Sequence, residues 1–133
     1  MSPRIAVSEQ RPGLQAARES IELELPELVE RLREIVGVRV VAYVANVKHT
    51  RPVADWASGK HAPGRDDEDR LRLTFQAARL MRERYSSTTI QSWFMGSNPA
   101  LDFEAPVRFI RERKAVDAAR EIMAAASSFT FVG

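Results

Sequence analysis

Apolar residues recur at helical spacing over most of this chain. Between Glu27 and Gly37, four of them share one face of a predicted helix, at i, i+4, i+7 and i+8: Leu28, Leu32, Ile35 and Val36. Residues 14–25 predict an earlier helix that Pro26 ends, although alternating acidic and apolar residues there also fit a strand. The first dozen residues are expected to form a frayed arm.

Two short helices separated by a turn are predicted next. Residues 38–45 are apolar on most sides, so this helix should be buried, and residues 46–49 form the turn. Thr50 is expected to cap the following helix, whose first turn tolerates Pro52. The inner face of that helix consists of Val53, Trp56 and Ala57, and Gly59 ends it before a loop at residues 63–64.

The longest predicted helix begins with four consecutive acidic residues, 66–69. Acidic residues in a first turn complement the helix dipole, and this explains them better than a metal site does. The apolar face of the helix is marked by Leu71, Phe75, Ala78 and Tyr85, and it is widened by Leu73, Ala77 and Leu80.

Short helices are also predicted for the rest of the chain. One contains Ile90, Trp93 and Phe94 and ends at Gly96, and a turn follows at residues 97–99, because asparagine before proline is disfavoured in a helix. Pro106 begins another helix, residues 115–126 form an alanine-rich one, and residues 127–133 are expected to be an extended apolar tail. Since no two alternating runs flank a hairpin turn, the predicted fold class is all-α.

Composition supports a globular protein. Of the 133 residues, 44% are hydrophobic and 29% are charged, and there is no apolar run of about 18 residues. The residues before Arg18 lack an apolar segment flanked by basic residues, so we do not expect a secretory signal. Cysteine is absent, which excludes disulfides and thiolate chemistry. This fits a reducing compartment, and we therefore expect the protein in the cytoplasm, with no membrane partner.

Positive charge is unevenly distributed along the chain. The formal net charge is only +2, but residues 38–65 carry five basic side chains against the single acid Asp55. The other stretches of the chain are close to neutral. A local positive excess of this kind indicates a polyanionic partner.

Residues suited to catalysis are scarce. His49 and His61 stand beside basic residues and lack the spacing of metal ligands, and the six glycines form no phosphate-binding loop. Asp102 and Glu104 are near enough to pair, but acids beside a proline-bounded turn commonly cap helices. We therefore expect no enzyme activity, no metal site and no cofactor.

Residues 38–63 have the features of a helix-turn-helix. Ala42 or Ala45 provides the small residue against which a second helix packs, and Val53 and Trp56 are the expected anchors of that helix. The segment from Trp56 to residue 63 resembles the end of the recognition helix in Xre-type repressors, although Ala42 and Val53 are 11 residues apart, one more than in the compact motif. The residues expected to contact DNA are Arg39, Lys48, His49, Thr50, Arg51 and Lys60. The alternative is a three-helix core whose basic side chains are merely solvated.

The C-terminal part resembles a known family. The order Trp93-Phe94, then Asn98-Pro99 and Leu101, then proline before apolar residues is similar to the toxin-binding domain of Xre-type antitoxins that pair with RES-domain toxins. A helix-turn-helix module upstream is usual in that family, so the resemblance covers about residues 27–133. The sequence differs from the family pattern at Phe103 and at residues 111–114.

This resemblance implies an all-α antitoxin of a type II toxin–antitoxin system. It implies a helix-turn-helix module at 27–85 and a toxin-binding module at 86–133, and it leaves out residues 1–26, which we expect to form an N-terminal arm. The partner would be a cognate RES-domain toxin that consumes NAD, and the antitoxin would block the active site of that toxin. The antitoxin would also bind its own promoter. It would form a homo-oligomer or a toxin–antitoxin hetero-oligomer. The implied toxin-binding residues are Trp93, Phe94, Asn98, Phe129, Thr130, Phe131, Val132 and Gly133. The alternatives are a DNA-binding regulator without a toxin and a protein-interaction adaptor.

Two aromatic features leave their own alternatives open. Trp93 and Phe94 are adjacent and cannot both face one side of a helix, so one belongs to the core and the other to an interface or a neighbouring helix. From Phe129 to Val132, apolar residues stand where chain ends are usually polar. They would dock on the protein's own core, insert into a partner's cleft or form a dimer contact.

Overall fold

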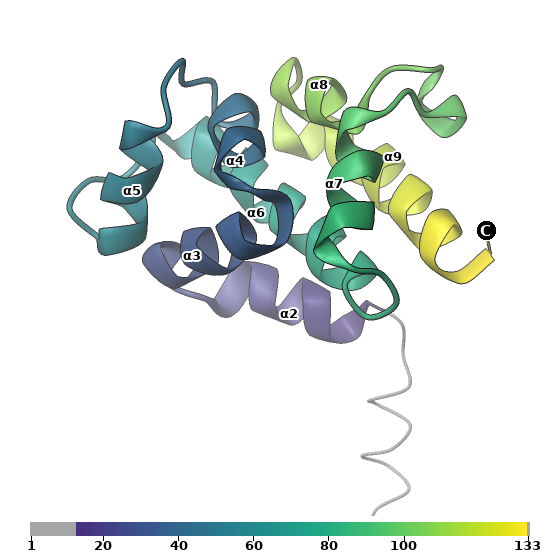
Figure 1. The fold of residues 1–133 in the computed structure, drawn as a ribbon, viewed down its shortest axis with the longest axis horizontal. Helices are drawn as coiled ribbons and strands as arrows, with labels where there is room; N and C mark the ends of the chain where they lie inside the picture. The colour runs from purple at the N-terminus through teal and green to yellow at the C-terminus, as the bar shows by residue number, and fades with distance from the viewer. Residues whose placement is uncertain (1–12, 133) are drawn as a thin grey trace, which may run out of the picture.

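The computed structural model describes residues 13–132, which fold into eight α-helices without a strand (Figure 1), so the all-α prediction is confirmed. None of these helices combines the length and the apolarity needed to cross a bilayer. The predicted arm at residues 1–12, and Gly133, lie outside the described residues. The elements are α2 (Leu14–Glu22), α3 (Leu25–Val36), α4 (Val38–Val44), α5 (Arg51–Ser58), α6 (Arg65–Met81), α7 (Ser87–Met95), α8 (Pro106–Arg111) and α9 (Ala115–Ser127), with single turns η1 (Pro99–Leu101) and η2 (Ser128–Val132).

The core is organised around α6. Helices α2, α3, α4 and α9 all pack on it, so it is enclosed on several sides and its buried positions exceed the single face that the sequence predicts. Its acidic first turn is confirmed, and Arg70 and Arg72, one turn further along, pair with Asp67 and Glu68 at 2.9 Å each. The buried side chains of α6 are Leu71, Leu73, Thr74, Phe75, Ala77, Ala78, Leu80 and Met81.

The break between α2 and α3 does not lie where the sequence predicts it. Helix α2 ends at Glu22, and Pro26 is in the first turn of α3, where its missing N–H costs nothing. The guanidinium group of Arg72 donates hydrogen bonds to the carbonyl oxygens of Ser20 and Leu23, at 3.1 and 2.9 Å. A cation from α6 therefore caps the C-terminal end of α2, an interaction that the helix dipole favours.

Glu19 provides a second polar link from α2. Its side chain, 16% exposed, accepts hydrogen bonds from Arg31 of α3 at 3.1 Å and from Arg79 of α6 at 3.0 Å. Burial alone raises the pKa of Glu19, but the hydrogen bond from Gln15 and the two guanidinium charges outweigh it. The pKa of Glu19 is therefore lowered from its ordinary value of 4.5.

The predicted helices from Leu28 to Gly59 are present. Gly37 ends α3 with φ +89°, a backbone conformation that glycine tolerates best, and α4 is buried along most of its length as expected. Helix α5 ends at Gly59, with φ +82°. Its predicted anchors, Val53 and Trp56, are 0% and 5% exposed.

The two predicted modules share one core. Helix α9 packs on α6, α7 packs on α3, and α8 packs on α4, so each C-terminal helix contacts an N-terminal one. The buried apolar residues of both parts belong to a single cluster. The described part of the segment predicted as an N-terminal arm forms α2, which packs on α6.

The predicted extended tail is wrong. After α9 the chain continues as the π-turn η2, and the hydroxyl of Thr130 donates to the carbonyl oxygen of Ala126 at 2.7 Å. Tyr85 donates through its hydroxyl to the carbonyl oxygen of Phe129, and Arg84 donates to that of Thr130, each at 3.1 Å. The end of the helix is thus capped by side chains from the segment after α6.

Candidate functional site

The first candidate site surrounds the turn between α4 and α5. Arg39 lies on the exposed side of α4, and the turn residues Lys48, His49 and Thr50 are exposed. Arg51 is the first residue of α5, whereas Lys60 lies beyond its opposite end. We call these six residues the basic surface.

The packing around this turn bears on the helix-turn-helix prediction. Both candidates for the small residue, Ala42 and Ala45, are buried, and α5 packs more extensively on α3 than on α4. Thr50 does not cap α5 as predicted: its backbone is already helical, at φ −85° and ψ −12°, and its side chain makes no capping hydrogen bond. A capping residue needs an extended backbone for its oxygen to reach the free N–H groups.

The cations of the basic surface are not neutralised by nearby acids. Within residues 13–132, no ion pair involves Arg39, Lys48, Arg51 or Lys60. Many arginines elsewhere in the described chain are paired: Arg31, Arg33, Arg65, Arg70, Arg72, Arg79, Arg108 and Arg113. The charges of these four cations are therefore not offset by an acidic side chain within ion-pair distance in the described part of the chain.

Part of the basic surface lines a pocket of about 420 Å³ together with a residue that the sequence analysis missed. This residue is Arg111, the last residue of α8, whose guanidinium group lies 4.4 Å from the ring centroid of Tyr43 on α4. Arg39, Lys48, His49 and Thr50 line the same pocket. No local pattern marks Arg111, because the residues it joins are far away in the sequence.

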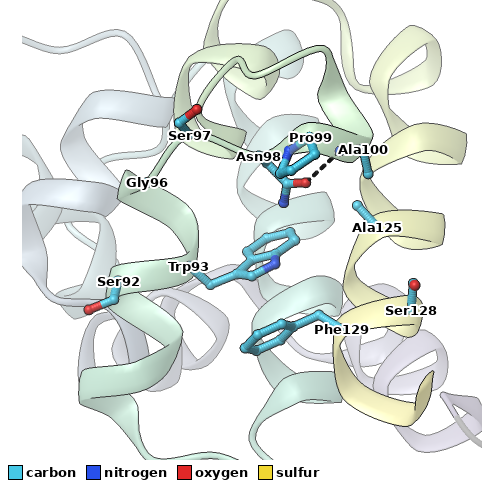
Figure 2. A pocket seen from close by; sticks show the side chains of 10 residues that line it. All are labelled: Ser92, Trp93, Gly96, Ser97, Asn98, Pro99, Ala100, Ala125, Ser128 and Phe129. Carbon is cyan, nitrogen blue, oxygen red and sulfur yellow. Dashed lines mark hydrogen bonds between the residues drawn. The ribbon is translucent and has the colours of Figure 1, made fainter. Parts of the chain in front are cut away.

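The second candidate site is a groove of about 420 Å³ between α7 and α9, which we call the aromatic groove (Figure 2). Trp93 reaches across it from α7 towards Phe129 of η2, and Asn98 and Pro99 lie at its upper end. The ring centroids of Trp93 and Phe129 are 6.3 Å apart. Its other lining residues are Ser92, Gly96, Ser97, Ala100, Ala125 and Ser128.

Trp93 and Phe94 are both buried, at 9% and 0% exposed, although they point in different directions from α7. Their rings meet edge to face, with centroids 5.0 Å apart. Both residues belong to the buried apolar core, and Trp93 also lines the groove.

Asn98 organises the turn that begins the upper wall of the groove. Its side-chain oxygen accepts a hydrogen bond from the N–H of Ala100 at 2.9 Å, and its carbonyl oxygen accepts from Leu101 and Phe103 at 2.9 and 2.8 Å. Its amide nitrogen is turned towards the groove, above Trp93 (Figure 2). Asn98 thus shapes the turn, as its position before proline predicts, and presents a donor to the groove.

The described tail residues divide into two groups. Phe129 packs against Tyr85, with ring centroids 4.6 Å apart, and Thr130 is 1% exposed, so both dock on the protein's own body. Phe131 is 37% exposed, with the guanidinium group of Arg84 5.6 Å from its ring centroid. Arg84 and Tyr85, which hold the tail, were not recognised as such in the sequence.

The residues considered for catalysis are dispersed. His49 and His61 are both exposed, and within residues 13–132 no three metal-ligating side chains gather. Glu104 does not cap a helix, as its position suggested, but pairs with Arg113 at 3.2 Å. Asp102 has a left-handed backbone, at φ 59°.

Comparison with models of protein families gives no match for this chain, and comparisons with curated proteins and with solved structures give none either.

Proposed function

We propose that this protein is the antitoxin of a type II toxin–antitoxin system, acting in the cytoplasm on a RES-domain toxin that consumes NAD. The observation that carries the proposal is the aromatic groove. Trp93, Asn98 and Phe129, three residues implied by the family resemblance, come from separate segments and line this one groove. A concave apolar surface with a few polar groups is the usual form of a binding site.

The exposed residues around the groove supply the contact with the toxin. Phe131 projects from η2, while Phe129 and Thr130 hold that turn in place. An aromatic side chain that is partly exposed beside a formed groove suits an interface anchor. The tail therefore acts as a docked, preformed turn, which reduces the ordering cost of binding.

Co-expression with the product of the neighbouring gene, which the proposal requires to be a RES-domain toxin, tests the proposal, with bacterial growth and cellular NAD as readouts. Ala100 is exposed and lines the groove, so Ala100→Arg should obstruct it and abolish neutralisation. Val116 on α9 is 82% exposed and lies outside the groove, so Val116→Arg is the matched control and should neutralise fully. Rescue by Ala100→Arg equal to wild type would reject the groove as the toxin site, and a wild-type chain that neither binds nor neutralises the toxin would reject the antitoxin function.

DNA binding through α4 and α5, as a helix-turn-helix, is the second part of the proposal. It is supported by the four unpaired cations of the basic surface, which match the phosphate contacts that dominate affinity for DNA. In the antitoxin this activity regulates the operon, and without a toxin it makes the protein a DNA-binding regulator. Helix α5 and the C-terminal tail lie at opposite ends of the molecule (Figure 1), so DNA and toxin can be bound together.

A further inference from the structure

We infer that the pocket between α4, the α4–α5 turn and α8 binds a phosphate of the DNA backbone, and that Arg111 is one of its phosphate ligands. This inference rests on the proposed DNA binding and extends it to a residue of the C-terminal half. The pocket is lined by Arg39, Tyr43, Lys48, His49, Thr50 and Arg111.

The charge of the pocket calls for an anion. Arg39, Lys48 and Arg111 line one pocket of about 420 Å³ without an acidic side chain among its lining residues. Two acids near Arg111 in the sequence are engaged elsewhere, since Glu112 pairs with Arg108 at 3.2 Å and Glu104 pairs with Arg113. Like charges held together repel one another, and a bound anion removes that cost.

Arg111 is positioned rather than free. Its guanidinium group lies 4.4 Å from the ring centroid of Tyr43, and this cation–π contact holds the group beside α4. No hydrogen bond joins the guanidinium N–H groups of Arg111 to any of residues 13–132. A planar guanidinium with unused donors is suited to a phosphate, which accepts two parallel hydrogen bonds.

The surroundings of the pocket favour DNA over a small anion. The hydroxyl-bearing Thr50 forms one edge, and directly beyond it the exposed Arg51 begins α5. Lys60 lies beyond the opposite end of α5, so unpaired cations are also present outside the pocket, where one small anion cannot reach them. A polyphosphate backbone can contact cations inside and outside the pocket, because its charges repeat every few ångströms.

The test measures binding of the full chain to a fluorescent 30-base-pair duplex of mixed sequence by anisotropy, over a series of salt concentrations. Arg111→Gln should weaken binding about fivefold to tenfold at 0.1 M salt and make the dependence of log K on log salt shallower by about one unit, as expected for one lost phosphate contact. The matched control is Arg120→Gln: Arg120 is exposed on α9, forms no ion pair within residues 13–132 and is outside the pocket. It loses the same charge and should stay within about twofold of wild type.

Further variants separate the inference from the proposed function. Arg111→Lys keeps the charge but loses the planar group, so it should recover part of the affinity, and circular dichroism checks that each variant is folded. If Arg51→Gln weakens binding but Arg111→Gln resembles Arg120→Gln, the DNA surface stands and the inference about the pocket fails. If the wild-type chain binds no duplex at 50 mM salt, both the pocket assignment and the DNA-binding part of the function are overturned. The same holds if calorimetry shows binding of inorganic pyrophosphate while the duplex is not bound. Toxin neutralisation is tested separately by the growth assay.

Discussion

Two phenylalanines in the same turn should differ sharply in their contribution to stability. Phe129 is partly buried against Tyr85, at 4.6 Å between ring centroids, whereas Phe131 is 37% exposed. Replacing a fully buried phenylalanine by alanine costs about 3–5 kcal/mol, so for the partly buried Phe129 we expect a loss of about 2–3 kcal/mol in the free energy of unfolding. For Phe131→Ala we expect a change within about 0.5 kcal/mol.

These free energies correspond to distinct melting temperatures. For a chain of 133 residues with an unfolding entropy of about 2.1 cal/mol/K per residue, Phe129→Ala should lower the Tm by about 7–11 °C, and Phe131→Ala by less than about 2 °C. Differential scanning calorimetry on both variants measures this. In the growth assay, the variant with the smaller effect on stability should still lose function: Phe131→Ala should stay folded and yet neutralise the toxin poorly.

Two results would refute this reasoning. If Phe129→Ala melted like the wild type, the tail would not be docked on Tyr85 in solution. If Phe131→Ala were folded and neutralised the toxin fully, the exposed ring would have no role in the interface, and the contact would have to lie elsewhere along the aromatic groove.

Three further outcomes are expected. Trp56→Ala removes a side chain that is 5% exposed and should cost about 3–5 kcal/mol in urea unfolding, whereas a midpoint equal to wild type would place Trp56 outside the core. Because the pKa of Glu19 is lowered in the folded state, its ionised form stabilises the fold above about pH 4.5, and this contribution is lost as the pH falls through the folded-state pKa. Glu19→Gln should therefore make the free energy of unfolding depend less on pH at acidic pH. If that dependence were unchanged, the result would contradict the ion pairs of Glu19 with Arg31 and Arg79. The double variant Lys48→Ala with Arg51→Ala should weaken binding to any duplex and make the salt dependence shallower by about two units, and unchanged affinity would show that these cations are only solvated.

Local sequence was sufficient for most of the helices. The apolar stripe from Leu28 to Val36, and the inward positions of Val53 and Trp56, follow from side-chain spacing alone, and the structure buries them. The helix end at Gly37 was also predictable, because the positive φ found there is one that glycine adopts with little strain. Interactions of this kind extend over a few neighbouring residues, so the order of residues along the chain is enough to predict them.

The groove was predictable only in part. Trp93, Asn98 and Phe129 were selected from a family resemblance, but their meeting depends on the packing of α7 and α9. The same groove is also lined by serines and by the alanines Ala100 and Ala125. Nothing in the sequence marks these small residues as part of a binding site.

Tertiary contacts decided the remaining features. Alternation from Phe129 to Phe131 has the period of a strand, yet the segment is a turn, because Tyr85 and Arg84 hydrogen-bond to its carbonyl groups. The pairing of Arg111 with Tyr43 likewise depends on how α8 packs on α4. A backbone conformation is chosen locally only when neighbouring residues satisfy its polar groups. Where a side chain from a distant segment supplies the partner, the free energy that selects the structure is absent from the local pattern.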